Sequence, residues 1–440
     1  MQQVFVNGTI VGMKKALVLA GGGTKGAYQA GAIRALCEMG MDDWDIVTGT
    51  SVGAMHAALV VQKDYDYLQG IYERLAKEEI FNGTLPLNLS LNELIEERKE
   101  IGKTLMQVVR DKGVDISPLK KNIHDLFDAE KFFSSHTDFG CITLREKGHA
   151  GVYVTKDMMH VHPEEWILAS CSAYPAFPAA EIDGVSYVDG GYFDNVPVDF
   201  ALRLGADEAV VIDLSAVPYH PHYLTRSNIR YLFPHSDPGD FLDFSKEKIS
   251  HLRILGYNDA WKMYGKYSGF KYTFERYARP RFFMKWYVEV EKLETRIKLA
   301  SNINEQFRSD EYITRRLKER MHLPVLSEQD YFDGMMDALM DLCDCDEEHI
   351  YTLKEARDVI LTTFADTWKE DYVYKPTLNV QQLAQFTKSL DTKGVVARLI
   401  HENLYPDHQL FGETTTLTLY PFEKAMADFV YWWMKELKEE

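Results

Sequence analysis

A serine between two glycines at the end of an apolar run is the feature that most constrains this chain. The sequence Gly-Thr-Ser-Val-Gly occupies residues 49–53, directly after the apolar residues 46–47 and before a run of small residues. Gly49 and Gly53 lack the Cβ atoms that would block a sharp strand-to-helix turn, and such a turn places Ser51 at the positive end of the next helix. The pattern predicts a nucleophile elbow with Ser51 as the nucleophile.

A glycine-rich loop lies about thirty residues earlier. Residues 16–20 have the apolar composition of a buried strand and lead into Gly-Gly-Gly-Thr-Lys-Gly at residues 21–26. Successive glycines let the backbone N–H groups of Gly21, Gly22 and Gly23 point inward and approach a ligand closely. The loop is therefore suited to a tetrahedral oxyanion or to a phosphate.

A third motif places a carboxylate at a strand end. Residues 184–191 read as a strand that ends in Asp189 and is followed by Gly190 and Gly191. An aspartate in that position is well placed to act as a base. Taken alone, an Asp-Gly pair more often forms a turn, so the catalytic interpretation depends on the three motifs occurring together.

These motifs, in this order, resemble those of the patatin-like phospholipase family. That family has a Gly-Gly-Gly-x-Arg/Lys-Gly loop, a Gly-x-Ser-x-Gly corner and an Asp-Gly-Gly/Ala element, which residues 21–26, 49–53 and 189–191 match. Weaker similarity is found at residues 169–178 and 194–197. The resemblance extends over roughly residues 13–268.

The resemblance implies a three-layer α/β/α sandwich with a mainly parallel sheet, and a serine acyl hydrolase acting on phospholipid or lysophospholipid esters. It implies a Ser51–Asp189 dyad that needs no histidine, cofactor or metal, with the amides of residues 21–23 as oxyanion hole. The supporting positions would be Lys25, Gly26, Gly49, Gly53, Gly190 and Gly191. Many family members carry arginine where this chain has Lys25, which keeps the charge but loses the planar fork.

Other enzyme classes fit the motifs less well. Residues 21–26 also satisfy the Gly-x-Gly-x-x-Gly dinucleotide fingerprint, but the second strand ends in residues 48–51 without the expected acidic residue. The loop is not a Walker loop, because Lys25 is followed by Gly26. A Ser-Asp-His triad would need a histidine after Asp189, and none of seven stands out: His220, His222, His235, His251, His349, His401 and His408.

The overall composition favours a soluble cytoplasmic protein. The chain has 440 residues and a net charge of −18, which argues against nucleic-acid binding. No apolar run is long enough to span a membrane, and the N-terminus lacks the features of a signal peptide. Met13 is an alternative to Met1 as the natural start. Five scattered cysteines suit a reducing compartment. A metal site at Cys343 and Cys345 is less favoured than an acidic turn.

We expect two domains, a catalytic domain over residues 13–270 and a mainly helical region of unknown role over residues 271–440. Strands are expected at residues 16–20, 46–47, 151–155 and 208–214. C-terminal helices are expected at residues 287–307, 329–342, 353–368, 380–404 and 421–437. The helical segment 91–133 is either a lid or a cover for one face of the sheet, and we favour the cover.

Residues 261–287 alternate cations with aromatic residues. Such a segment is either a peripheral contact with a lipid membrane or an interdomain stretch whose rings are buried, and we favour burial. A catalytically idle regulatory or partner-binding protein on the same fold is the main alternative to an enzyme, although intact Ser51 and Asp189 count against it. The sequence does not indicate the oligomeric state.

Overall fold

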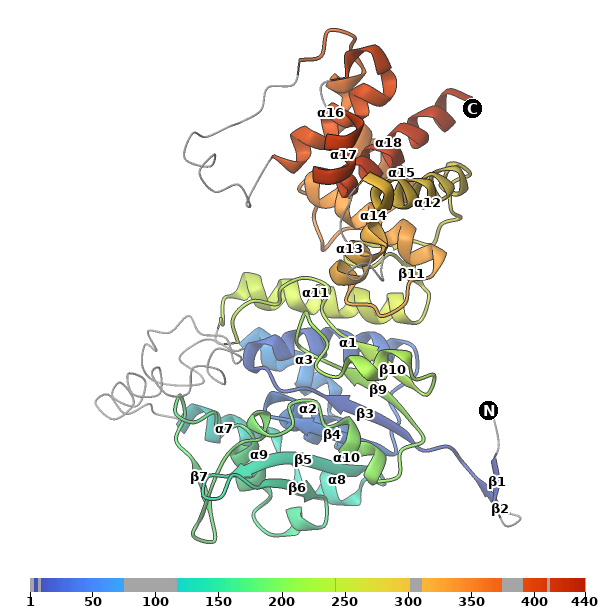
Figure 1. Cartoon of the computed structure of the whole chain (residues 1–440). Helices are drawn as coiled ribbons and strands as arrows, with labels where there is room; N and C mark the ends of the chain where they lie inside the picture. Colours follow the sequence, from blue (N-terminus) through green and yellow to red (C-terminus); the bar gives the residue numbers. More distant parts are fainter. Residues whose placement is uncertain are drawn as a thin grey trace. The chain divides into compact units, whose positions relative to one another are not determined.

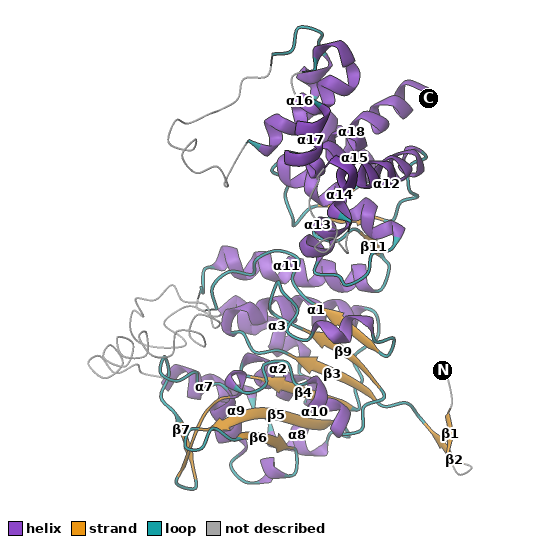
Figure 2. Cartoon of the chain, in the orientation of Figure 1, coloured by secondary structure: helices purple, strands orange, loops and turns teal. Residues whose placement is uncertain are grey.

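The computed structural model describes residues 4–6, 9–74, 117–241, 243–300, 311–373, 391–409 and 412–439. The chain divides into two compact units, Met1–Tyr264 and Gly265–Glu440 (Figures 1 and 2). The sequence placed this boundary at residue 270. Most of the expected helical segment 91–133 lies outside the described residues, so its role as cover or lid stays a prediction.

The first unit is built on an eight-stranded, mainly parallel sheet. In spatial order its strands are β10 (Ile229–Leu232), β9 (Glu208–Ile212), β3 (Lys15–Leu19), β4 (Ile46–Thr50), β5 (Asp138–Arg145), β8 (Val185–Asp189) and β7 (Ala180–Ile182), with β6 (Gly151–Thr155) beside β5. The strands from β10 to β5 are parallel, while β6, β7 and β8 join antiparallel. A separate hairpin pairs β1 (Val4–Val6) with β2 (Thr9–Val11).

Helices cover both faces of this sheet. They are α1 (Gly26–Glu38), α2 (Val52–Val61), α3 (Tyr65–Arg74), α7 (Ser117–Leu126), α8 (Ala129–Ser134), α9 (Pro163–Ser170), α10 (Val198–Arg203) and α11 (Lys246–Met263). A Cβ on Gly49 of β4 would meet α2, whereas one on Gly140 of β5 would meet Phe200 of α10. Since Gly49 pairs with Cys141, Gly140 points to the other face. This places α2 and α10 on opposite faces and confirms the expected three-layer sandwich.

Strand β5 brings the ends of two other strands together. Its residues pair with β6 along one edge, so β4 and β8 must share the other edge. On that edge Thr50, the last residue of β4, pairs with Ile142, and Asp189, the last residue of β8, pairs with Thr143. The two strands run toward each other, and both must leave the sheet where they meet.

The second unit is mainly helical. Its helices are α12 (Phe282–Ala300), α13 (Tyr312–Met321), α14 (Glu328–Leu342), α15 (Leu353–Thr363), α16 (Thr392–Leu404), α17 (Glu413–Leu419) and α18 (Pro421–Glu439). They surround a core that includes the fully buried Trp286, Phe332 and Phe429. A small sheet joins β11 (Tyr267–Ser268), β12 (Thr273–Glu275) and β13 (Ile350–Tyr351).

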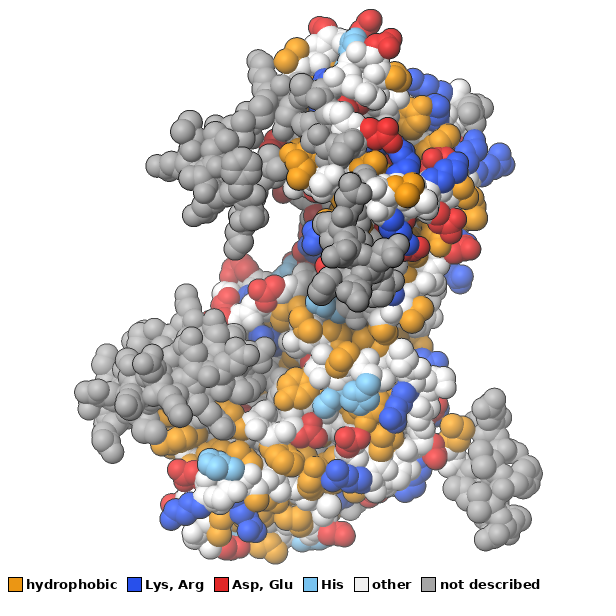
Figure 3. Space-filling view, viewed as in Figure 1, with side chains coloured by type: hydrophobic (Ala, Val, Ile, Leu, Met, Phe, Trp, Pro, Cys, Tyr) orange, Lys and Arg blue, Asp and Glu red, His pale blue; other side chains and the backbone are white. Residues whose placement is uncertain are grey.

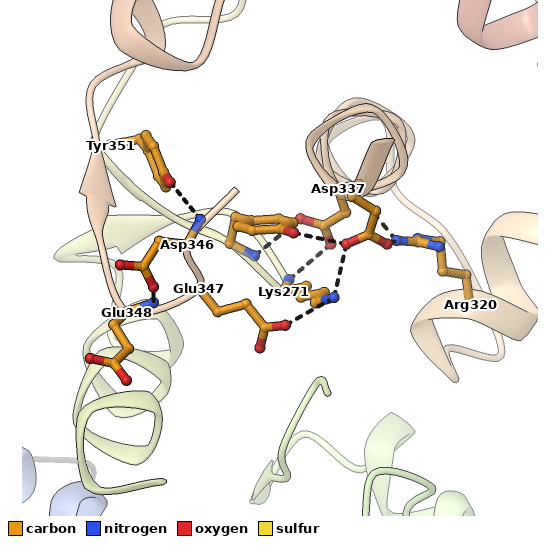
Figure 4. Close-up of polar contacts among 9 residues, drawn as sticks. Lys271, Arg320, Asp337, Asp346, Glu347, Glu348 and Tyr351 are labelled. Atoms are coloured by element: carbon orange, nitrogen blue, oxygen red, sulfur yellow. Dashed lines mark hydrogen bonds and ion pairs between the residues drawn. The ribbon is translucent and has the colours of Figure 1, made fainter. Parts of the chain in front are cut away.

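A polar network attaches the start of this unit to α14. The backbone N–H groups of Lys271 and Tyr272 donate to Asp337 at 2.8 and 3.1 Å. The Lys271 ammonium group lies 2.8 Å from Asp341 and 3.0 Å from Glu347, and Arg320 pairs with Asp341 (Figure 4). These contacts are buried or half-buried, so we assign the cluster a structural role.

Five of the aromatic rings of segment 261–287 are interior. The side chains of Tyr272, Phe274, Phe282, Phe283 and Trp286 are at most 2% exposed. This agrees with the favoured interpretation for these five rings, whereas the other rings of the segment are half-buried: Trp261, Tyr264, Tyr267, Phe270, Tyr277 and Tyr287. Within the described parts of the chain, no helix is both long and apolar enough to cross a bilayer.

Candidate active site

Ser51 occupies a strained corner between β4 and α2. Its φ of 55° and ψ of −127° lie in a region that non-glycine residues rarely adopt. A Cβ on Gly49 would collide with the backbone of Gly53, and one on Gly53 would collide with the carbonyl of Leu19. The corner closes this tightly because both flanking positions are glycine, as the sequence predicts.

Adding one methyl group at Gly53 tests whether this corner is closely packed. We expect Gly53→Ala to lower the free energy of unfolding by about 1–3 kcal/mol, because the strand backbone cannot move aside. Gly70→Ala is the matched control, since the nearest atom to its Cβ would be 3.5 Å away on the flexible Arg74 side chain. Urea unfolding of both variants measures the difference, and equal stability would contradict a close-packed corner.

Asp189 lies next to this corner. Its side chain is 3% exposed and forms a hydrogen bond with the Ser51 side chain, and the Gly191 N–H donates to it at 2.7 Å. Burial raises the pKa of Asp189 to about 6, while the hydrogen bonds from Ser51 and Gly191 act in the opposite direction. The carboxyl group is thus a stronger base than an exposed aspartate and is still ionised at neutral pH.

The glycine loop lies beside Ser51, and its amides differ in what they bind. The Gly21 N–H donates to the Asn195 carbonyl at 3.0 Å, and the Thr24 N–H donates to the Phe241 carbonyl at 2.9 Å. Among the described residues no acceptor is seen for the N–H groups of Gly22 and Gly23, both of which line the same cavity as Ser51. Of the three amides expected to form an oxyanion hole, that of Gly21 is therefore already occupied.

Lys25 and Gly26 have different surroundings. Burial lowers the pKa of the Lys25 ammonium group, against the opposing influence of Asp237 and Asp240, and Lys25 is absent from the lining of the Ser51 cavity. Gly26 begins α1, and a Cβ there would collide with the Tyr72 hydroxyl group. Lys25 thus faces acidic side chains rather than the cavity, and Gly26 allows close packing.

Ser51 and Asp189 share a cavity of about 890 Å³. Its apolar lining includes Met55, Ile71, Leu119, Phe177, Phe241 and Phe244. A cavity of this size and character accommodates an apolar ligand of drug or lipid-chain dimensions. Because these residues come from distant parts of the chain, no local sequence pattern identifies them as a group.

Two supporting residues had no role assigned from the sequence. The Ser51 N–H donates to the Ser170 hydroxyl group at 2.9 Å, and the Asn195 side-chain amide donates to the Gly21 carbonyl at 3.1 Å. Both residues are more than nine-tenths buried. Ser170 lies in segment 169–178 and Asn195 in segment 194–197, so the available signal was the weaker family similarity of these two stretches.

No histidine completes a triad in the described structure. His56 lines the cavity, but its ring nitrogens are each 2.8 Å from a partner, Gln29 and the Tyr72 hydroxyl group. Burial lowers the pKa of His56 to about 3, so it stays neutral. The histidines that follow Asp189 are absent from the cavity lining, and the described residues contain no cluster of His, Cys, Asp or Glu able to hold a metal ion.

The family model and the similar proteins agree in their descriptions. A model described as patatin-like phospholipase matches residues 17–202. Patatin-like phospholipase domain-containing protein 7 of Rattus norvegicus is 27% identical over 216 residues, covering 47% of this chain and 14% of that protein. Lysophospholipase nte1 of Aspergillus terreus is 28% identical over 213 residues, covering 47% of this chain and 12% of that protein.

Among solved structures, VipD from Legionella pneumophila aligns with a TM-score of 0.38 and 13% identity, over 96% of this chain and 92% of that one. The match to each of the two curated relatives takes in less than a sixth of that relative's length. The residues matched by the family model lie within the unit that contains Ser51 and Asp189. Over residues 17–202 this chain is therefore similar to the patatin-like phospholipase family.

Proposed function

We propose that this protein is a serine acyl hydrolase that cleaves carboxylic esters of lipids. In this proposal Ser51 is the nucleophile and Asp189 is the general base. The observation that carries it is the hydrogen bond between the Ser51 side chain and a buried Asp189 inside an apolar cavity. The five cysteines, all of them free thiols, suit activity in the cytoplasm.

The first half of the reaction forms an acyl-enzyme. Asp189 accepts the hydroxyl proton as Ser51 Oγ attacks the ester carbonyl carbon, and the carbonyl oxygen takes up the negative charge. We place that oxygen near the N–H groups of Gly22 and Gly23, which have no acceptor among the described residues. Collapse of the intermediate breaks the ester C–O bond, and Asp189 returns the proton to the leaving alcohol.

The second half releases the acyl chain. Asp189 accepts a proton from a water molecule that attacks the acyl-serine carbonyl, and the same two amides bind the developing oxyanion. Breaking the bond to Ser51 Oγ yields the free fatty acid, while the proton returns from Asp189 to Ser51. A carboxyl group with a pKa of about 6 is suited to accepting and donating a proton near neutral pH.

Two observations favour phospholipid or lysophospholipid esters as substrates. The cavity walls around the Ser51 corner are apolar, which suits an acyl chain. Two relatives that match this domain are named as a patatin-like phospholipase domain-containing protein and a lysophospholipase. Rates of hydrolysis measured with a panel of monoacyl and diacyl phospholipids test this part of the proposal.

Labelling with a fluorophosphonate tests whether Ser51 is activated. We expect one label per folded chain, located at Ser51 by peptide mapping, because the neighbouring base and amides favour attack on phosphorus as they favour attack on an ester. The same protein unfolded in urea is the control and should not react. If the folded chain stays unlabelled, or both samples react equally, the site is not catalytic and the regulatory alternative is favoured.

A further inference from the structure

The second unit has a surface where exposed apolar side chains are surrounded by cations. On α12, Met284 and Val288 are 50% and 43% exposed, and they share one face of the helix with Arg281 and Lys285. On α18, Trp432 is half-buried and Lys435 is exposed. We refer to Arg281, Met284, Lys285, Val288, Trp432 and Lys435 as the α12–α18 surface.

Direct contacts hold the two helices together at this surface. The Glu436 carboxylate accepts hydrogen bonds from the N–H groups of Arg281 and Phe282, each at 3.1 Å. It thereby caps the start of α12 with the end of α18, and its negative charge faces the positive end of the helix dipole. The α12–α18 surface is therefore continuous across two helices.

Cations frame the Trp432 ring. The ammonium group of Lys285 lies 5.8 Å from the ring centroid, and that of Lys435 lies 5.2 Å from it. Figure 3 shows Lys and Arg side chains interspersed with hydrophobic and acidic ones where the second unit carries α12 and the end of α18. Two nearby acids are engaged, since Glu436 caps α12 and Glu289 lies 2.7 Å from Lys292.

We propose that the α12–α18 surface binds the surface of an anionic lipid bilayer. Half-buried tryptophan favours the headgroup level of a membrane, and lysine side chains extend toward phosphates while their alkyl chains stay in apolar surroundings. Exposed Met284 and Val288 supply the apolar area that enters the interface. An anionic bilayer offers apolar contact and negative charge together over such an area. Without a cationic surface of this kind, a chain of net charge −18 would be repelled by such a bilayer.

This surface shares Arg281, Met284 and Lys285 with segment 261–287 but includes none of the aromatic rings of that segment. Five of the rings that the sequence highlighted there are core residues, whereas the exposed Met284 and Lys285 alternate with buried rings on α12, and residues of α18 complete the surface. The proposal does not depend on the proposed hydrolase activity. Each can therefore fail without the other.

Sedimentation with vesicles tests the proposal on the full chain. We expect binding to phosphatidylserine-containing vesicles, weak binding to pure phosphatidylcholine vesicles, and a loss of binding with rising NaCl concentration. The double variant Lys285→Glu/Lys435→Glu should weaken the partition coefficient by at least about tenfold. Met284→Ser/Val288→Ser should also weaken it, because apolar area is lost without a change in charge.

The matched control is Lys131→Glu/Lys147→Glu, which changes net charge equally at two exposed positions of the first unit. It should keep most of the binding, and all variants should hydrolyse a water-soluble short-chain ester alike if the chain is a hydrolase. Absence of vesicle binding by the unaltered chain, or equal losses in control and test variants, would falsify the proposal. A dimer that dissociates in Lys285→Glu/Lys435→Glu would overturn it in favour of self-association.

Discussion

Replacing Ser51 with alanine is expected to lower kcat for ester hydrolysis by at least about a thousandfold, because the acyl-enzyme cannot form without the Ser51 oxygen. The fold should persist, since the backbone corner depends on Gly49 and Gly53 rather than on the Ser51 hydroxyl group. Hydrolysis of a short-chain ester and of a lysophospholipid, each with thermal unfolding in parallel, provides the measurement.

Ser117→Ala is the matched control for that change. Ser117 lines the same cavity but belongs to α7, whereas Ser51 lies at the corner between β4 and α2. Its replacement should leave kcat within a few-fold of the unaltered chain. A Ser51→Ala protein with undiminished activity would exclude Ser51 as the nucleophile, even if the Ser117→Ala variant behaves as expected.

The second large effect is expected from Asp189→Asn, which should lower activity and raise stability at the same time. The pKa of Asp189 is about 6 in the folded chain, against 3.8 for the ordinary carboxyl group. Between these values the folded state binds more protons than the unfolded state, so stability falls as pH rises from about 4 to about 6. Above that window the buried charge costs roughly 3 kcal/mol, which asparagine does not incur.

Asp189→Asn should therefore unfold at higher denaturant concentration than the unaltered chain at pH 8, and this advantage should disappear near pH 4. Its kcat/KM should be strongly reduced, whereas the unaltered chain should show a rate that rises with pH through about 6 as Asp189 ionises. Urea unfolding and a pH–rate profile measure the two effects. The exposed Asp183→Asn serves as control and should change neither.

A stability gain at pH 8 that persists unchanged at pH 4 would show that the gain does not arise from the Asp189 charge. A flat pH–rate profile would argue against Asp189 as the base. The two measurements are independent, because the first reports on burial of the carboxyl group and the second on its chemistry. Agreement between them would show that one buried charge supports activity and costs stability.

The local features of the proposed catalytic site could be predicted from the sequence because their signal is local. Gly49 and Gly53 permit a turn that other residues would block, and Ser51 lies between them in five consecutive residues. The expected strand at residues 151–155 has the same bounds as β6, and those at 16–20 and 208–214 agree with β3 and β9 within two residues. Short apolar runs of this kind are recognisable without knowledge of their partners.

Helices that depend on their surroundings were harder to predict. No helix was expected at α17, because it contains four threonines and threonine is β-branched and has a low intrinsic helix propensity. It forms where it packs against α12 and α18. Likewise α13 was not expected, although its Ile313, Leu317 and Met321 repeat at helical spacing and are buried.

The sequence by itself determined the residue types of the candidate site, the layered fold and the helical character of the C-terminal unit. Tertiary structure decided which groups meet. Asp189 reaches Ser51 because β4 and β8 approach each other along one edge of β5, through pairings of Thr50 with Ile142 and of Thr143 with Asp189 that join distant parts of the sequence. It also decided that the Gly21 amide is occupied by Asn195 and that five of the rings of segment 261–287 are buried. Such outcomes depend on long-range packing and hydrogen bonding, which local sequence patterns do not encode.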